Sequence, residues 1–252
     1  MNRTVYPMRV AAIALGVSVV SSPLAAIADS PFSGKVAAGA IAASGNSESS
    51  TFNFEFGLNY DKGVWHNALK ANAMQARSST EDDAGNSDKQ TTSELYAVSL
   101  RSALDFTEND YVFAQLGFEK DLFGAVRERT TQTLGYGRRV LNDDAHKLDL
   151  ELGAGARQSL AQEDGARRES EVVGRAGFVY AWQFSETSRF AQSVTAEYGE
   201  SNTYTESLSE LKLSVIGGVF ASLAFTVKHN SDVPADTEQT DTISSVSLSY
   251  EY

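Results

Sequence analysis

The chain has no cysteine among its 252 residues. An exported protein without cysteine has no disulfide framework, and it also lacks the cysteine that anchors a bacterial lipoprotein. Long apolar runs are scarce as well, because polar residues interrupt the apolar patches after Asp29 well before they reach the length of a membrane-spanning helix. No later segment is therefore a candidate transmembrane helix. If the protein enters a membrane, it can do so only as a closed barrel, because lipid leaves every backbone polar group to be satisfied internally.

Basic residues are the next deficit, with 21 Lys and Arg against 33 Asp and Glu and a formal net charge of −12. This balance disfavours nucleic acid as a partner, because binding to phosphate requires basic patches. The mean hydropathy of −0.27 resembles that of a soluble protein. It is equally compatible with a membrane barrel, whose strands are polar on one face.

The first residues predict a secretory signal peptide. Arg3 and Arg9 precede a short apolar run over 10–20, and Ala26 and Ala28 provide the small-x-small pattern of a cleavage site. We predict a cleaved signal at 1–28 and one barrel domain over 29–252, and the early basic residues argue against a buried helix or a membrane anchor. Loss of two arginines and no acid would bring the formal charge from −12 to −14.

Alternation with a period of two dominates the remaining chain, which indicates strands with one face apolar and the other polar. From 245 to 252 every even position is apolar or aromatic, and every odd position is polar. We predict that Phe54, Leu150 and Leu248 face lipid, and that their neighbours Glu55, Asp149 and Glu251 face the interior. The predicted strands are 33–43, 51–60, 64–78, 91–106, 111–122, 128–140, 147–159, 168–184, 188–200, 205–215, 220–230 and 240–252.

The predicted connections alternate in length. Those after every second strand are short and contain turn residues, whereas most of the others are longer and polar. An even strand number with short turns at one end is typical of a bacterial outer-membrane barrel, with short turns and both termini in the periplasm. The fold class is therefore an all-β, single transmembrane antiparallel β-barrel of about twelve strands.

A soluble β-sandwich or a lipocalin-like barrel with an apolar interior would also alternate. Against this alternative, aromatic residues cap the apolar faces near the predicted strand ends, as in the girdles of membrane barrels. The residues concerned are Phe52, Tyr60, Trp65, Phe106, Tyr111, Trp182, Phe184, Phe190, Tyr250 and Tyr252.

Three segments resemble a known family: 42–49 (AASGNSES), with its S-G-N-S signature, 111–123 (YVFAQLGFEKDLF) and the closing hairpin from 231. The family is the salt-induced outer-membrane proteins, a bacterial domain of unknown function (number 481), and the resemblance covers Gly34 to Tyr252. It implies an outer-membrane barrel of the Gram-negative envelope, with a link to salt stress, and it supplies no catalytic residue. The terminal Tyr252 departs from the Phe common at this position, but it remains aromatic.

The predicted interior face contains charges of both signs, seven acidic and seven basic. The functional interpretation is a water-filled pore whose charges set selectivity. The structural interpretation is an ionic network that fills a narrow barrel, since buried charges must be paired or hydrated. The lumen-lining candidates are Glu55, Lys70, Arg101, Glu119, Arg139, Asp149, Glu151, Arg157, Arg175, Glu197, Glu210, Lys212, Lys228 and Glu251.

Other constellations are weak. His66, His146 and His229 lack the spacing of a metal site. The consecutive His229-Asn230-Ser231 contains residue types that barrel phospholipases use, but its side chains cannot converge without partners elsewhere. The acidic residues Glu81, Asp82, Asp83 and Asp88 fail the EF-hand spacing, and the glycines of 135–137 and 153–155 indicate close approach or bending. We predict no catalytic residue, no cofactor and no metal.

The leading functional hypothesis is a non-enzymatic outer-membrane barrel, either a porin-like minor channel with weak cation preference from acids at its mouth or a structural protein of envelope stress. The alternatives are a barrel enzyme that acts on lipid or lipopolysaccharide and a soluble periplasmic binding protein. The expected partners are outer-membrane lipid, lipopolysaccharide and the barrel-assembly machinery, which would recognise the last strand ending in Tyr250 and Tyr252.

Overall fold

The computed structural model describes residues 30–43, 47–81, 87–163, 165–233 and 237–252. The predicted signal peptide lies outside these residues. In the part of the chain that is described, no helix is long and apolar enough to cross a membrane. The elements are twelve β-strands: β1 (Phe32–Ala43), β2 (Ser47–Lys62), β3 (Trp65–Glu81), β4 (Ser87–Asp105), β5 (Asp110–Asp121), β6 (Val126–Asn142), β7 (His146–Ala161), β8 (Glu169–Ser185), β9 (Ser188–Tyr198), β10 (Thr203–Ile216), β11 (Val219–Asn230) and β12 (Thr240–Glu251).

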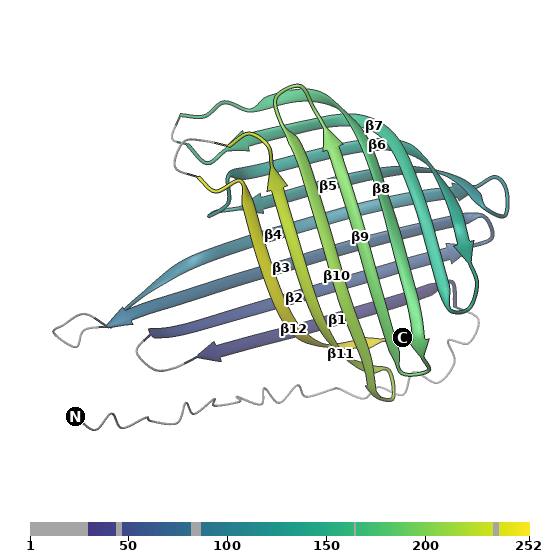
Figure 1. Cartoon of the computed structure of the whole chain (residues 1–252), viewed down its shortest axis with the longest axis horizontal. Coiled ribbons are helices and arrows are strands. Elements are labelled where there is room, and N and C mark those ends of the chain that lie inside the picture. Colours follow the sequence, from purple (N-terminus) through teal and green to yellow (C-terminus); the bar gives the residue numbers. More distant parts are fainter. Residues whose placement is uncertain (1–29, 44–46, 82–86, 164, 234–236) are drawn as a thin grey trace, which may run out of the picture.

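The twelve strands form one closed antiparallel barrel, which confirms the predicted fold class. Each strand pairs with its neighbours in sequence, and β12 closes the sheet against β1. The strands on one wall cross those on the opposite wall at a large angle, since closing a sheet requires the strands to tilt (Figure 1).

The two ends of the barrel differ in their connections. The turn end, as we call it, carries the short turns after β2, β4, β6, β8 and β10 together with the residues at which β1 begins and β12 ends. At the turn between β6 and β7, the Asp143 carboxylate accepts hydrogen bonds from the backbone N–H groups of His146 and Ala145, which lowers the pKa of Asp143. The opposite loop end carries longer connections, such as 162–168 and 231–239, as the sequence predicts.

The exposure of side chains alternates as expected, with the apolar face outward. On β12, Val246 and Leu248 are exposed, whereas Ser247 and Ser249 are buried. Phe54, Leu150 and Leu248 are all exposed on the outside, where they were predicted. A soluble barrel needs the reverse arrangement, with apolar residues inside.

Aromatic pairs surround the turn end on the outer surface, which confirms most of the predicted girdle. Examples are Phe32 with Tyr60, at 4.8 Å between ring centroids, and Trp182 with Phe184, at 5.3 Å. The prediction for Tyr111 is wrong, because this residue is buried inside the barrel with Phe113. The alternation around Tyr111 is ambiguous, since residues 111–114 (YVFA) are apolar on both faces of the strand.

The seam between β1 and β12 is the shortest ladder in the barrel. Its register pairs run only from Lys35↔Glu251 to Ala38↔Leu248, with backbone hydrogen bonds between Gly34 and Tyr252 just beyond. By contrast, β1 pairs with β2 along its whole length, from Phe32 to Ala43. The seam therefore holds the two edge strands together only near the turn end.

Candidate functional site

All fourteen charged residues predicted for the lumen project into the interior of the barrel. Thirteen do so in ion pairs or hydrogen bonds with other inward side chains, and Lys70 lines an internal cavity. Several of these contacts join strands that are not neighbours in the sheet, so they can be made only through the interior. Whether these residues line a conducting path stays a prediction.

One cluster crosses the full width of the barrel near the loop end. Lys228 Nζ on β11 lies 2.5 Å from Glu119 Oε2 on β5, and in a ring of twelve strands these two are diametrically opposite. Arg129 on β6 donates a hydrogen bond to Asn230 on β11, at 2.9 Å, and its guanidinium lies 3.7 Å from the centroid of the Tyr204 ring on β10. All of these side chains except Glu119 are less than a tenth exposed.

A second cluster lies beside the first, on β7, β8 and β9. Arg157 pairs with Glu171 at 2.7 Å and with Glu197 at 3.7 Å, and Glu197 also pairs with Arg175 at 3.2 Å. Arg157 also donates a hydrogen bond to the backbone carbonyl of Asn202. Arg157 is 1% exposed and the adjacent inward Val173 is 0% exposed, so water does not reach this part of the interior.

We call the six residues Glu119, Arg129, Arg157, Glu197, Tyr204 and Lys228 the loop-end layer. A side chain that lined an open pore would be accessible to water. These side chains are instead largely buried, and their charges are paired across the interior, the arrangement that makes buried charge tolerable.

Further toward the turn end, the contacts are less continuous. Arg101 on β4 pairs with Glu151 on β7 at 2.6 Å, and the Tyr111 hydroxyl donates to the same carboxylate at 2.9 Å. On the other side of the lumen, Lys35 contacts Glu55 at 2.8 Å and Glu210 at 3.5 Å. These contacts leave space between them in the lumen.

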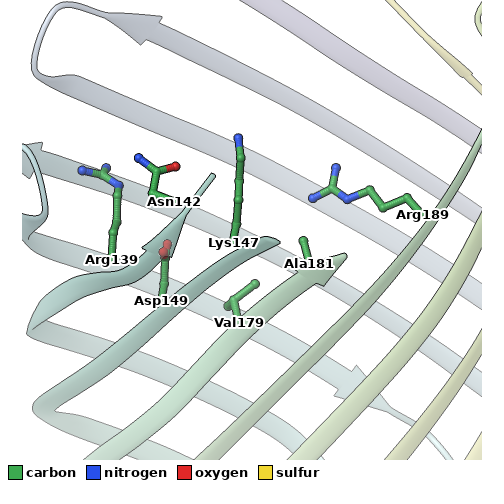
Figure 2. A pocket seen from close by; sticks show the side chains of 7 residues that line it. All are labelled: Arg139, Asn142, Lys147, Asp149, Val179, Ala181 and Arg189. Carbon is green, nitrogen blue, oxygen red and sulfur yellow. The ribbon is translucent and has the colours of Figure 1, made fainter. Parts of the chain in front are cut away.

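That space is a cavity of about 480 Å³, which continues into a smaller one of about 220 Å³ nearer the turn end. The two cavities share Arg139, Asp149 and Val179 in their walls. We call them together the vestibule. Figure 2 shows the smaller cavity, with Arg139, Lys147 and Arg189 extending from the strands into one space.

Sequence reasoning missed several residues that complete these contacts. Lys35 pairs with Glu55, Arg129 joins the loop-end layer, and Asp105 holds Arg139 at 2.8 Å and His66 at 3.0 Å. Lys147 and Arg189 were also missed. The sequence did indicate that Lys147 points inward, because it alternates with Asp149 and Glu151 on the same face of β7. Alternation does not show, however, which opposing strand each inward side chain meets.

The residues His229, Asn230 and Ser231 do not form a catalytic cluster. Asn230 is buried inside, where it accepts from Arg129 and Asn202. His229 lies on the outer face of β11 and contacts the Thr240 hydroxyl at 2.9 Å. Among the residues that the structure describes, no group of three or more His, Cys, Asp or Glu could hold a metal. Of the acidic residues considered for cations, Asp82 and Asp83 lie outside the described residues.

A closed antiparallel barrel with an apolar exterior, a charged interior and short turns at one end is a β-barrel of the outer-membrane type. Comparison with known proteins identifies the family: residues 36–252 match the model described as "Protein of unknown function, DUF481", and the chain belongs to that family. This confirms the family resemblance, but the match does not confirm the name "salt-induced".

A relative from Escherichia coli (strain K12), the uncharacterized protein YdiY, is 31% identical over 231 residues, covering 89% of this chain and 85% of the relative. Solved structures include the COG4313 outer membrane channel from Pseudomonas putida F1, with 10% identity, a TM-score of 0.49 and coverage of 88% of this chain and 94% of that one. Another is the translocator domain of the autotransporter NalP from Neisseria meningitidis, with 13% identity, a TM-score of 0.47 and coverage of 87% of each chain.

Proposed function

We propose that this protein is a non-enzymatic barrel of the bacterial outer membrane that acts as a normally closed conduit. The loop-end layer closes the lumen on the outer side, and the vestibule opens it toward the periplasm. The observation that supports this proposal most directly is the ion pair between Lys228 and Glu119, because it joins opposite walls of the barrel at a partly buried position.

The membrane location rests on the exterior of the barrel. Large apolar side chains are exposed around it, and a closed sheet is the form in which β-strands satisfy their backbone polar groups in lipid. The predicted signal at 1–28 would export the chain, and the turn end would then face the periplasm. Lipid and lipopolysaccharide would surround the barrel, and the assembly machinery would act on β12 with its terminal Tyr250 and Tyr252.

The location has a direct test. The protein should fractionate with outer membranes, and its electrophoretic mobility should change on heating, because a folded barrel resists detergent until it is boiled. Recovery as a soluble periplasmic monomer in buffer without detergent would contradict the proposal.

Closure by charges, instead of by an apolar plug, suggests how the conduit could open. A paired layer is stable only while each charge keeps its partner, since one unpaired buried charge is costly. Displacement of one member therefore favours hydration of the whole layer and passage of water. Two further expectations remain predictions: the link to salt stress, which rests on the resemblance, and the weak cation preference, which rests on the acidic residues Glu81, Asp82 and Asp83 between two predicted strands.

Conductance in planar bilayers tests the closure. The native protein should show rare, small openings, whereas the double variant Glu119→Ala/Lys228→Ala should conduct more strongly and for longer, because it removes both ends of the bridge and leaves neither unpaired. The control is Asp110→Asn/Arg138→Gln, which removes an ion pair of 3.1 Å that lies on the outer face.

Three outcomes would count against this mechanism. A large steady conductance of the native protein would show that the lumen is already open. An unchanged conductance in the double variant would show that the layer is not the barrier. Silence of both proteins, with folding verified by heat modifiability, would indicate a structural barrel.

A further inference from the structure

The walls of the vestibule contain more positive than negative charge, although the whole chain is strongly acidic. Its acids are Asp149, Glu151 and Glu210. Its basic residues are Lys70, Arg101, Arg139, Lys147, Arg175 and Arg189. The excess would favour anions wherever the walls exclude bulk water and concentrate the field.

Ion pairs neutralise part of this charge, but they leave an excess of basic side chains. Arg101 and Lys35 hold two of the three acids, Glu151 and Glu210. The third, Asp149, has its hydrogen bond from the Tyr111 hydroxyl, at 3.5 Å. Arg139 and Arg175 pair with Asp105 and Glu197, neither of which lines the vestibule.

Three basic side chains make no ion pair or hydrogen bond in the described part of the chain: Lys70, Lys147 and Arg189. Each projects from a different strand, β3, β7 and β9, into the same connected space. Lys212, the inward neighbour of Arg189 on β10, is occupied by Glu251 at 2.5 Å. In Figure 2 the side chains of Lys147 and Arg189 extend into one opening, with Asn142 and Arg139 beside them.

We propose that the vestibule is a binding site for a small organic or inorganic anion that carries more than one carboxylate or phosphate group. A guanidinium can hold such a group through two parallel hydrogen bonds, and an ammonium group adds a compact point charge. Lys147 and Arg189 would hold one anionic group near the mouth, and Lys70 would attract a second group deeper inside. The combined volume of the two cavities is in the range typical of small-ligand pockets.

Alternation, ion pairing and cavity geometry therefore assign different roles to the two halves of the lumen. In the loop-end layer the charges are paired with one another, whereas in the vestibule three cations have no ion-pair partner in the described residues and can bind a ligand. The inference does not depend on whether the barrel conducts, because binding from the periplasmic side requires only that the vestibule is accessible.

Titration calorimetry on the folded protein in detergent tests the site, with pyrophosphate and citrate as probes at constant ionic strength. Saturable binding of one anion per barrel is expected, and a preference between the two probes would identify phosphate or carboxylate as the ligand group. The variant Lys147→Gln/Arg189→Gln should weaken binding by about tenfold or more, which corresponds to one lost charge-assisted hydrogen bond.

Two controls make the result specific. Arg138→Gln removes a basic residue from the outer face, and it should leave binding unchanged. Lys70→Gln should weaken the two-group probes more than inorganic phosphate. Absence of saturable binding by the folded native protein, or equal binding by the native protein and Lys147→Gln/Arg189→Gln, would overturn the proposal. Neither outcome bears on the conductance test of the loop-end layer.

Discussion

Tyr111 shows how single residues shape the lumen. Its ring packs beside Phe113 and lies over Gly137 on the neighbouring strand, where a Cβ atom would come within 2.2 Å of the ring carbon Cζ. Gly135 makes the same room for Phe113, with a Cβ only 2.5 Å from that ring. Gly135 and Gly137 therefore leave the space that the rings of Phe113 and Tyr111 occupy, so both rings can lie against the barrel wall.

Substitution at Gly137 should be costly for this reason. Gly137→Ala forces the Tyr111 ring away from the wall and weakens its hydrogen bond to Glu151, so the free energy of unfolding should fall by about 2 kcal/mol, as for other overpacked sites. The control is Gly174→Ala, since a Cβ there meets nothing within 4 Å. Equal stability of the two variants in urea titrations of the refolded barrel would show that Tyr111 does not need this space.

At the scale of an element, β7 presents two chemically opposite faces. Leu150 is exposed on the outer face, whereas Asp149 lines the vestibule. Leu150→Arg places a charge in lipid and should destabilise the barrel by about 2–4 kcal/mol near the midplane, whereas Asp149→Asn should cost far less because the vestibule is polar. Urea titration in lipid vesicles measures both, and equal tolerance would contradict the assignment of the two faces.

The same strand shows what the sequence could and could not predict. Alternation places Leu150 outside and Asp149 inside without knowledge of any partner, and it gives the bounds of all twelve strands within a few residues. It cannot show that Glu151 meets Arg101 from a strand three positions away, because that contact depends on the tilt and the width of the closed barrel. Glu119 and Lys228 were likewise predicted as inward residues, but not as partners.

Tyr111 marks the other limit of sequence reasoning. Where both faces of a strand are apolar, as over 111–114, alternation cannot show which face points into the barrel. The inward Tyr111 was therefore assigned to the outer girdle. Gly135 and Gly137 were the available signal. Both lie on the inward face of β6, opposite Phe113 and Tyr111, where missing side chains leave room for two aromatic rings.

For the whole molecule, the important property is the separation of two kinds of interior along one axis. The loop-end layer is largely buried, paired and nearly balanced in charge, whereas the vestibule is an open cavity with more basic than acidic residues in its walls. The chain as a whole is strongly negative. A path that began at acidic outer loops and ended in a basic vestibule would change its preferred ion along its length, so equilibrium binding and conductance would report on different ends of the barrel.

The short ladder between β1 and β12 has a mechanical consequence. A closed sheet is expected to open first where the fewest backbone hydrogen bonds hold it, and here that place is the seam beyond Ala38 and Leu248, where the ladder between β1 and β12 ends. Toward the loop end, the margins of β1 and β12 can part without breaking any other ladder. The barrel would then open laterally into the bilayer while the other strands stayed paired. Lipid acyl chains would gain a route to the interior that bypasses both ends of the barrel.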